Sequence, residues 1–397
     1  MAANPVARLF AFYLPQFHPI PENDRWWGPG FTEWTNVAKA RPLFPGHVQP
    51  RLPRDLGFYD LRVHEVREAQ ADLARECGIE GFCYWHYWFG NGRRLLERPF
   101  NEVLESGKPD YPFSLAWANQ SWTGIWHGSP NRVLVKQTYP GRADEIAHFN
   151  FARRAFEDHR YQRVDGKPVF VVFAPQDLPN TADFIDHWRE LAHKSGLPGL
   201  YFVALSDRYD GTDRYNNPIL APFDAIAPHP PHDFLQDLPQ HRAARWRRRF
   251  RERDFQRLGV QLPAHMRRPA RYDFAKVVAR AFHDLPDDPR FLPCVLPGWD
   301  NTPRSGTRGV VFEGVTPELV AAYLQKAVAR VRNRPPEQRI VFLKAWNEWA
   351  EGNYLEPDHL HGIAYLEAVR RVMYPSPSGE AEAASRPLIE PSLLLRA

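Results

Sequence analysis

Cysteine and long apolar runs are both scarce in this sequence of 397 residues. Its three cysteines, Cys77, Cys83 and Cys294, are an odd number and have no metal-type spacing. They argue against a disulfide framework and favour a reducing compartment. The apolar run near the start covers only residues 9–14 before Pro15 interrupts it, which is too short for a signal peptide or a membrane span. We therefore expect a soluble protein of the cytoplasm, with no transmembrane segment.

An excess of one charge is also missing from most of the chain. The net charge is +4, and residues 242–253 alone hold seven Arg and one Glu, so the remainder is close to neutral. A general nucleic-acid-binding surface is therefore not indicated, and we predict no nucleic-acid partner. An Arg run of this kind is usually a solvated helix face. Contact with an anionic glycan or membrane surface is the functional alternative.

Signatures of metals and cofactors are equally scarce. The histidine pairs at 229 and 232 and at 359 and 361 have no companions at a metal-binding spacing. The sequence contains no Gly-rich phosphate loop and no nucleophile elbow. We predict neither a metal nor a cofactor, and the sequence does not indicate an oligomeric state.

Apolar runs of strand length alternate with amphipathic stretches of helix length. The predicted strands are residues 8–14, 79–89, 113–119, 167–173, 200–205, 223–228, 291–298 and 339–349. The predicted helices are residues 60–78, 93–107, 142–158, 181–196, 272–284, 316–333 and 362–373. The strands are apolar throughout, as expected for strands buried on both faces.

This alternation predicts an α/β fold, a single-domain (β/α)₈ TIM barrel over residues 1–373 with long loops at its C-terminal rim. Residues 374–397 are rich in Pro, Ser, Glu and Ala, so we expect a flexible tail. The fifth-to-sixth connection lacks a convincing helix and the sixth-to-seventh connection is oversized. A doubly wound sheet is the alternative.

Aromatic residues make up 14% of the chain, including 13 Trp, and they recur where the predicted strands end. Tryptophan has a flat apolar face and an N–H group, which suit a sugar ring as well as a protein core. Barrel enzymes place their active sites at the C-terminal ends of the strands. The recurrence at one rim favours an aromatic-lined carbohydrate cleft. The predicted substrate-binding residues are Tyr13, Trp26, Trp27, Glu33, Trp85, His86, Trp117, Asn119, Trp122, Trp299, Asp300, Lys344, Trp346 and Asn347.

The last predicted strand leads into "KAWNEWAEGNYLEPDH", which holds Glu348 and Glu351 three residues apart. The period of two predicts that Lys344, Trp346 and Glu348 point into the barrel, and a helical turn would bring Glu351 to the same side. A lysine there should be buried within hydrogen-bonding reach of a carboxylate. Two carboxylates held close together raise at least one pKa, so stability does not call for the pair. A pair of carboxyl groups is what glycoside hydrolysis requires, and we predict that Glu348 and Glu351 are catalytic.

Several ordered motifs also carry a family resemblance. The segments "FYLPQFH", "WWGPGFTEW", "WANQSW", "GWDNTPR" and "WNEWAEGNYLEPD" resemble the WbsX-like proteins of bacterial surface-polysaccharide gene clusters. These proteins are similar to the family 99 glycoside hydrolases, the endo-α-mannosidases. The resemblance covers about residues 8–373 and implies a (β/α)₈ barrel without a metal. It further implies retention of configuration through a 1,2-anhydro sugar, with Glu348 as base on the sugar 2-hydroxyl and Glu351 as general acid and base. This chain has Ala350 where the mannosidases usually have histidine.

We therefore expect a glycoside-hydrolase-like enzyme that cleaves or transglycosylates α-linked glycans of bacterial surface polysaccharide. Its partner would be an oligosaccharide or polysaccharide substrate. One alternative is a glycosyltransferase in the biosynthesis of lipopolysaccharide O-antigen or capsule, since some WbsX-like proteins carry that label. The other is a non-catalytic glycan-binding barrel, against which the retention of both carboxylates argues.

Overall fold

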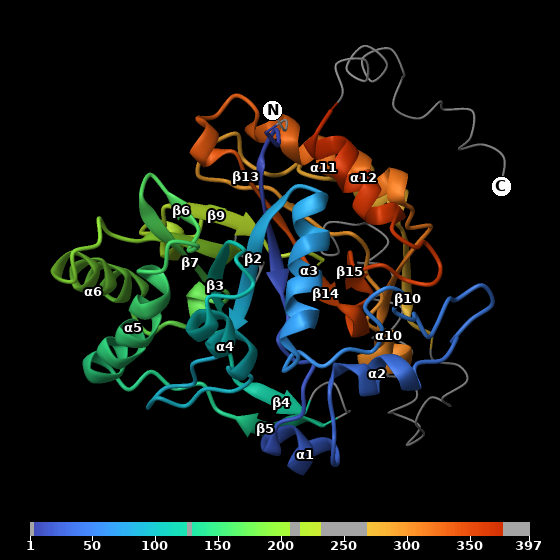
Figure 1. Cartoon of the computed structure of the whole chain (residues 1–397), viewed down its shortest axis with the longest axis horizontal. Helices are drawn as coiled ribbons and strands as arrows, with labels where there is room; N and C mark the ends of the chain where they lie inside the picture. Colours follow the sequence, from blue (N-terminus) through green and yellow to red (C-terminus); the bar gives the residue numbers. More distant parts are fainter. Residues whose placement is uncertain (1–3, 125–128, 207–214, 232–267, 376–397) are drawn as a thin grey trace, which may run out of the picture.

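Parallel strands form one barrel in the computed structural model of the chain, which describes residues 4–124, 129–206, 215–231 and 268–375 (Figure 1). The strand order is β11-β13-β1-β2-β3-β7-β8-β9, and every neighbouring pair in it is parallel. The bounds are β1 Arg8–Tyr13, β2 Ile79–His86, β3 Phe113–Trp117, β7 Lys167–Val172, β8 Tyr201–Ser206, β9 Ala225–Pro228, β11 Cys294–Val295 and β13 Ile340–Leu343.

The two end strands of this order meet through the residues just before β11. The backbone N–H of Ile226 donates to Arg290 O over 2.8 Å, and Leu292 N–H donates to Ile226 O over 2.8 Å. These bonds nearly close the sheet. The predicted (β/α)₈ barrel is confirmed, and the doubly wound alternative is wrong.

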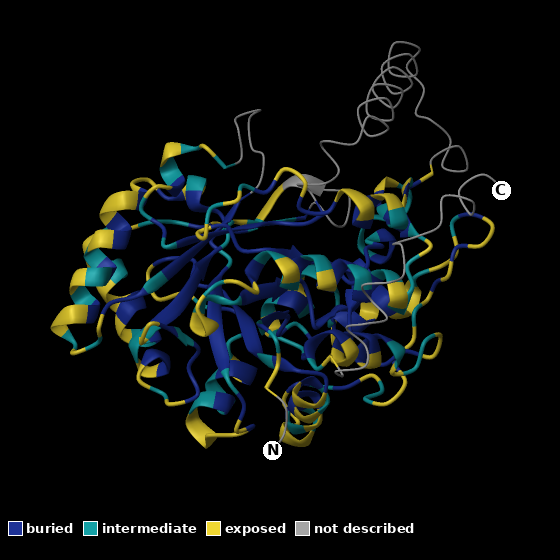
Figure 2. Cartoon of the chain, turned by 90° about the horizontal axis from the view of Figure 1, so that it is seen from above, coloured by how far each residue is buried: buried dark blue, intermediate teal, exposed yellow. Residues whose placement is uncertain are grey.

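Helices cover the outside of the barrel, with their exposed faces turned away from the buried strands (Figure 2). Asn180 caps the start of α6 by accepting from Asp183 N–H, and Thr316 caps α11 by accepting from Leu319 N–H. The bounds are α3 His64–Glu76, α4 Arg98–Ser106, α5 Arg142–Phe156, α6 Thr181–Lys194, α9 Phe274–Arg280, α11 Pro317–Val331 and α12 Ala364–Met373. Each of them lies within a predicted helix or within a residue or two of its bounds.

Additional elements decorate the loops between strands and helices. The helical ones are α1 Pro21–Trp27, α2 Glu33–Lys39, α10 Thr302–Ser305 and the 3₁₀ turns η2 Pro175–Asp177, η3 Pro218–Leu220, η5 Gly306–Arg308, η6 Pro336–Gln338 and η7 Trp349–Glu351. The extended ones are β4 Trp122–Gly124, β5 Ser129–Val135, β6 Arg163–Val164, β10 Ala270–Asp273, β12 Val310–Glu313, β14 Asn347–Glu348 and β15 Asn353–Tyr354. A small parallel sheet of β10 and β12 was not predicted.

The two irregular connections behave as the sequence indicated, as far as the structure describes them. Between β8 and β9 the described residues contain only the turn η3. The connection from β9 to β11 carries β10 and α9. The Arg-rich segment 242–253 and nearly all of the predicted tail, residues 376–397, lie outside the described residues. In the part of the chain that is described, no helix is both long and apolar enough to cross a membrane.

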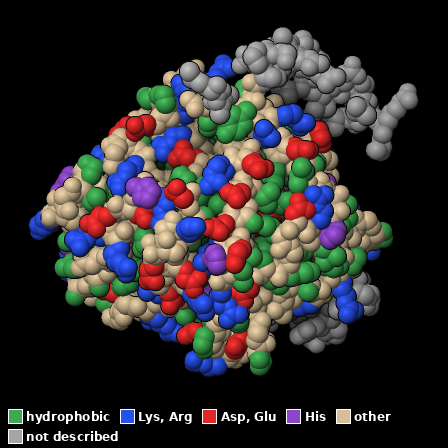
Figure 3. Space-filling view, in the orientation of Figure 1, with side chains coloured by type: hydrophobic (Ala, Val, Ile, Leu, Met, Phe, Trp, Pro, Cys, Tyr) green, Lys and Arg blue, Asp and Glu red, His purple; other side chains and the backbone are tan. Residues whose placement is uncertain are grey.

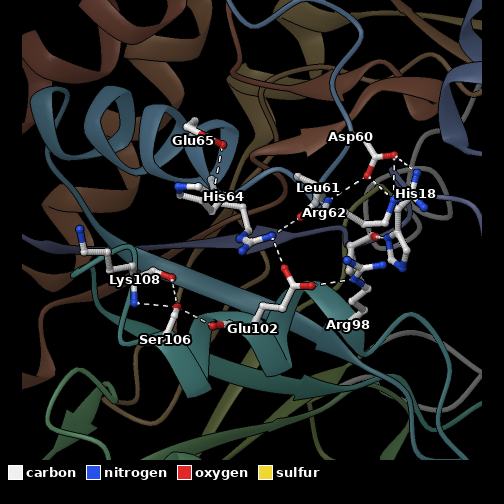
Figure 4. Close-up of polar contacts among 12 residues, drawn as sticks. His18, Asp60, Leu61, Arg62, His64, Glu65, Arg98, Glu102, Ser106 and Lys108 are labelled. Atoms are coloured by element: carbon white, nitrogen blue, oxygen red, sulfur yellow. Dashed lines mark hydrogen bonds and ion pairs between the residues drawn. The ribbon is translucent and has the colours of Figure 1, made fainter.

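Ion pairs tie neighbouring outer helices together near the rim. The Glu102 carboxylate accepts from Arg98 Nε over 2.7 Å and pairs with Arg67 Nη1 at 2.9 Å, which links α4 to α3 (Figure 4).

His18 is buried in the loop after β1, where its Nδ1 lies 2.9 Å from Pro15 O, and burial lowers the pKa of its ring to about 4. On the face drawn in Figure 3, acidic and basic side chains are interspersed.

The strands alternate their side chains between the barrel interior and the helix layer. Phe12 of β1 stacks on Trp85 of β2 at 4.8 Å and on Phe342 of β13 at 5.4 Å between ring centroids, inside the barrel. The neighbouring residue Tyr13 faces outward and donates to Gln70 of α3 over 2.6 Å. This alternation decides which strand-end residues reach the rim.

Candidate active site

Glu348 and Glu351 lie side by side at the C-terminal end of the barrel. Glu348 ends β14, and the single 3₁₀ turn η7 brings Glu351 back beside it, so that the two carboxyl groups hydrogen-bond to each other. Both residues are buried. Gly352 ends the turn at φ 58°, and a Cβ at this position would lie 2.8 Å from the backbone of Asp300. Only glycine fits this close approach.

One arginine joins two acidic residues next to this pair. Arg304, on the short helix α10, donates from Nη1 to Glu351 over 2.6 Å and from Nε to Glu33 over 2.7 Å. Glu33 is the first residue of α2. The side chains of all three are largely removed from solvent, at 11%, 7% and 1% exposed for Arg304, Glu351 and Glu33. Burial disfavours the charge of Arg304, but the surrounding carboxylates raise its pKa above the ordinary value.

Glu348 has a different environment from Glu351. Its Oε1 accepts one hydrogen bond, from Trp85 Nε1 at 3.0 Å. Burial and the adjacent Glu351 raise the pKa of Glu348 to about 8, and the positive charges of Lys344 and Arg304 only partly oppose this. Two carboxyl groups in contact are costly to ionise together, which favours a pair that shares one proton.

Lys344 is buried beneath the pair, as predicted, but its hydrogen-bond partners differ from the prediction. Its ammonium lies 2.9 Å from His229 Nε2 and donates to Pro230 O over 3.1 Å. The ring of Trp299 lies 5.2 Å from Nζ, within range of a cation–π contact. The expected carboxylate partner is wrong, because His229 and a backbone carbonyl occupy the direction in which the ammonium points.

Aromatic residues surround these charges. Trp122 packs edge-on against Tyr87 at 5.0 Å and against Trp26 at 6.1 Å. Burial raises the pKa of Tyr87, and the charge of Glu348 adds to this increase, so the Tyr87 hydroxyl lies near the pair. Phe173 lies 5.6 Å from the Trp85 ring. Trp27 packs against Phe31, with 6.1 Å between the ring centroids.

The structure thus brings together most of the charged residues that were predicted and only part of the aromatic set. The residues gathered around the pair are Glu33, Trp85, Trp299 and Lys344, with Trp122 and Trp26 joined to them through Tyr87.

Two predicted rim residues face the helix layer instead. Trp117 packs against His148 of α5 and Phe184 of α6, with centroid distances of 4.8 and 5.5 Å. The Nε2 atom of His86 lies 2.9 Å from His148 Nε2, and burial lowers the pKa of His86 to about 3. In β2 and β3 these positions alternate outward, so the structure does not bring either side chain to the carboxyl pair.

Tyr13 and Trp346 are also directed away from the pair. Tyr13 is fully buried against Phe82 and Tyr84, and its hydroxyl binds Gln70 of α3. Trp346 packs on Phe82 at 5.3 Å. Phe82 and Trp85 lie on opposite faces of β2. Trp346 contacts Phe82 and Glu348 contacts Trp85, so these two side chains also point to opposite sides of the strand. The strand β13 ends at Leu343, and the bends at Lys344 and Trp346 interrupt the expected alternation.

Three predicted polar residues serve to tie strand ends together. Asn119 binds both backbone groups of Ala174, at 2.7 and 2.8 Å, and Asn347 binds both of Leu14, at 2.7 and 3.1 Å. Asp300 accepts from His47, Gln49 and Thr302. All three side chains are fully buried, and these bonds occupy them. The structure therefore shows a structural role for each of them, and their contact with a substrate stays a prediction.

Arg304, Tyr87 and His229 belong to the site but were not among the predicted residues. Tyr87 lies near the end of the predicted strand 79–89, His229 directly follows the predicted strand 223–228, and Arg304 belongs to the segment "GWDNTPR". Their location at the end of a strand was the sequence feature that could have identified them. That feature does not separate them from neighbours such as His86, whose side chains point outward.

Among the described residues, no three His, Cys, Asp or Glu side chains are grouped so as to hold a metal ion. The arrangement offers a carboxylic acid next to a carboxylate, two buried cations and aromatic faces. Groups of this kind can transfer protons to and from a bound molecule.

The fold and this rim site define a (β/α)₈ barrel with its polar centre at the C-terminal ends of the strands. The chain belongs to the family described as "Glycosyltransferase WbsX", whose model matches residues 9–369. It is 38% identical over 383 residues to "Uncharacterized protein WxcX" of Xanthomonas campestris pv. campestris, in both strain B100 and strain ATCC 33913. That match covers 96% of this chain and 51% of the relatives, so the chain spans about half of their length.

Solved structures share the fold at low identity. A "Glycoside hydrolase-like protein" matches with a TM-score of 0.55 and 14% identity, covering 95% of this chain and 96% of its own. The GH99 endo-alpha-mannosidase from Bacteroides thetaiotaomicron matches with a TM-score of 0.53 and 13% identity, covering 95% of this chain and 99% of its own. At these identities the likeness concerns the fold.

Proposed function

We propose that the chain is a glycan-active enzyme that cleaves or transglycosylates α-linked glycans, with Glu348 and Glu351 as its acid–base pair. The observation that carries the proposal is two mutually hydrogen-bonded, buried carboxyl groups at the C-terminal rim of a barrel. A buried like-charge pair costs stability, and proton transfer is the function that such a pair serves.

The surroundings of the pair support a sugar as the substrate. Trp85, Trp122 and Trp299 provide flat apolar faces near the carboxyl groups, and such faces suit the C–H surfaces of sugar rings. The family relationship and the shared fold with an endo-alpha-mannosidase agree with this class of substrate. Because Ala350 replaces the histidine usual in those enzymes, the proposal does not extend to mannose.

The division of roles follows the family resemblance. In this scheme Glu348 takes the proton of the sugar 2-hydroxyl, and the resulting oxygen attacks the anomeric carbon to form a 1,2-anhydro sugar. Glu351 gives its proton to the departing glycosidic oxygen. In the second step Glu351 takes a proton from water, or from the hydroxyl of an acceptor sugar, which opens the anhydro ring, and Glu348 returns its proton to the 2-oxygen. Configuration is retained, and the protons balance over the cycle.

A glycosyltransferase of surface-polysaccharide biosynthesis is the second candidate, and the family description favours it. A transferase uses an activated donor sugar and releases its carrier. The same pair would then activate the acceptor hydroxyl. The two candidates differ in whether an activated donor is required.

The test is incubation of the protein with a panel of α-linked oligosaccharides and with bacterial surface polysaccharides, followed by mass spectrometry of the products. Fragments released without any activated donor support the hydrolase or transglycosylase. Products that form only when a nucleotide- or lipid-linked sugar is added support the transferase. Glycans that bind without conversion under either condition indicate a binding barrel and contradict both enzyme proposals.

Two isosteric variants then separate the roles on an active glycan. Glu351→Gln removes the acid, so turnover of a natural glycan should fall about 10²–10⁴-fold. A substrate with a good leaving group needs little protonation, and its first step should be much less affected. Glu348→Gln should slow both substrates, because the 2-hydroxyl must be activated in either case. Equal losses on both substrates would contradict this division, and near-normal activity would contradict the catalytic assignment.

A further inference from the structure

Arg304 touches one member of the pair, Glu351, and acts on the other, Glu348, only through its charge at a greater distance. Its guanidinium contacts Glu351 at 2.6 Å, whereas the only N–H donor on Glu348 among the described contacts is Trp85, at 3.0 Å. Glu33, on α2, holds the opposite edge of the guanidinium at 2.7 Å. Arg304 is thus fixed between two carboxylates in a largely buried position.

We propose that Arg304, held by Glu33, keeps Glu351 anionic in the unliganded protein, so that the proton of the pair rests on Glu348. Arg304 is in this sense a positioning residue. The catalytic role of this arrangement rests on the proposed function. The position of the proton does not, because it is a property of the free protein.

The charges around the pair favour this distribution. Opposite charge in direct contact stabilises a carboxylate by about 1–3 pKa units. Of the two members of the pair, the described contacts join Arg304 directly to Glu351, while the ammonium of Lys344 is held by His229 and Pro230. Two further titratable neighbours among the described residues are Tyr87, which lies near both carboxyl groups, and Lys39, which lies near Glu33. The pKa of Tyr87 is raised, so its hydroxyl stays neutral and does not change the balance.

This resting state has a consequence for the reaction. The proposed acid, Glu351, carries no proton until a substrate arrives. When a sugar 2-hydroxyl donates to Glu348, the existing proton of Glu348 passes along the hydrogen bond to the Glu351 carboxylate. One O–H bond breaks and one forms, and the net charge of the pair is unchanged. Glu348 is then the base and Glu351 the acid, which couples formation of the acid to substrate binding.

The experiment follows the carboxyl ¹³C resonances of glutamate in the unliganded full-length protein, from pH 5 to pH 10. Glu348→Gln and Glu351→Gln assign the two signals. In the wild type, the Glu348 signal should titrate above neutral pH while the Glu351 signal stays at its anionic position. A Glu351 signal that titrates near neutral pH, or a Glu348 signal that is anionic at pH 6, would overturn the proposal.

Variants of the arginine test its role in the same spectra. Arg304→Met removes the charge, so Glu351 should take a measurable share of the proton and the apparent pKa of the pair should rise by about 1–3 units. Arg304→Lys keeps the charge and is the matched control, with the proton mainly on Glu348. Glu33→Gln leaves Arg304 in place but loosens it, so its effect should lie between these. Unchanged spectra in a folded Arg304→Met protein would refute the role of Arg304.

These titrations need no turnover, so they separate the two proposals. A protein that converts no glycan but holds its proton on Glu348 contradicts the proposed function and supports the resting state. If a glycan substrate is found, the loss of activity at alkaline pH should move upward in Arg304→Met, because the pair keeps its proton to higher pH. Should Arg304→Met not fold, the wild-type titration and Arg304→Lys still decide the question.

Discussion

Glu356 and the Glu348–Glu351 pair are both buried carboxyl sites in the segment that follows β13, yet their neighbours differ. Three donors bind Glu356: Trp349 Nε1 at 2.6 Å, Gln70 Nε2 at 2.6 Å and the Tyr59 hydroxyl at 2.9 Å. Burial nevertheless raises the pKa of Glu356 to about 7. Glu348 accepts from Trp85 and otherwise faces a second carboxyl group.

A raised pKa therefore does not by itself distinguish a reactive group from a structural one. Both oxygens of Glu356 already accept hydrogen bonds from protein donors, and the bond from Gln70 joins the rim segment to α3. Another molecule would have to displace these donors in order to bind Glu356. In the described contacts, the oxygens of the pair meet each other, the indole N–H of Trp85 and the guanidinium of Arg304. The saturation of its oxygens by protein donors indicates that Glu356 supports the structure, and the contrast agrees with the proposal that the pair is the reacting site.

The largest expected difference between the two sites is in activity. On a converted glycan, Glu348→Gln should reduce turnover by about 10²–10⁴-fold while the protein stays folded. Glu356→Gln should change turnover per folded molecule by less than about tenfold, because Glu356 does not reach the pair's proton. Rates are compared after the folded fraction of each variant has been measured by circular dichroism. A greater loss in Glu356→Gln than in Glu348→Gln would reverse the assignment.

Stability should change in opposite directions at the two sites. In Glu356→Gln an amide NH₂ replaces an acceptor among N–H donors, so we expect a loss of about 2–4 kcal/mol in the free energy of unfolding. In Glu348→Gln the amide still accepts from Trp85 and can donate to Glu351, and the cost of a buried acid disappears. We expect a gain of about 2 kcal/mol at pH 8. Urea unfolding at pH 8 measures both changes.

The wild-type protein should lose stability as the pH rises from about 5 to about 8. A carboxyl group in the unfolded chain releases its proton near pH 4–5, whereas folded Glu348 keeps its proton up to a pKa of about 8 and Glu356 up to about 7. The folded state binds more protons in this window, so raising the pH favours unfolding. The expected slope from Glu348 is about 1 kcal/mol per pH unit. In Glu348→Gln the decline should be visibly smaller, and an equal decline would contradict the raised pKa.

The sequence predicted the barrel well because its strands are buried on both faces, and uniform apolar runs such as 167–173 are easy to locate. The carboxyl pair was found because Glu348 and Glu351 are close in sequence. These features depend on local order along the chain.

The orientation of strand-end residues could not be predicted in the same way. With both faces of β2 apolar or aromatic, nothing in the sequence decides whether Trp85 or His86 faces inward. The partners of the pair also come from distant segments, since Glu33 and Arg304 meet only through the closure of the barrel. Lys344 finds His229 rather than a carboxylate because the loop after β9 folds over it. These contacts depend on tertiary structure.

The smallest expected effect comes from removing the indole N–H donor at each of the two sites. Trp85→Phe removes the N–H that stabilises ionised Glu348 and keeps a ring to stack on Phe12. A hydrogen bond to a charged group contributes about 1.5–3 kcal/mol, so loss of this donor should raise the pKa of Glu348 by about 1–2 units. The same ¹³C titration detects this shift.

Trp349→Phe is the matched control, because it removes the equivalent donor from Glu356 and leaves a ring beside Tyr354. It should raise the pKa of Glu356 and leave that of Glu348 in place. Turnover at pH 7 should fall several-fold in Trp85→Phe, since the base is harder to ionise, and should hardly change in folded Trp349→Phe. If both variants shift both carboxyl groups, the two sites are electrostatically coupled. The contrast between a reacting pair and a saturated structural carboxylate would then not hold.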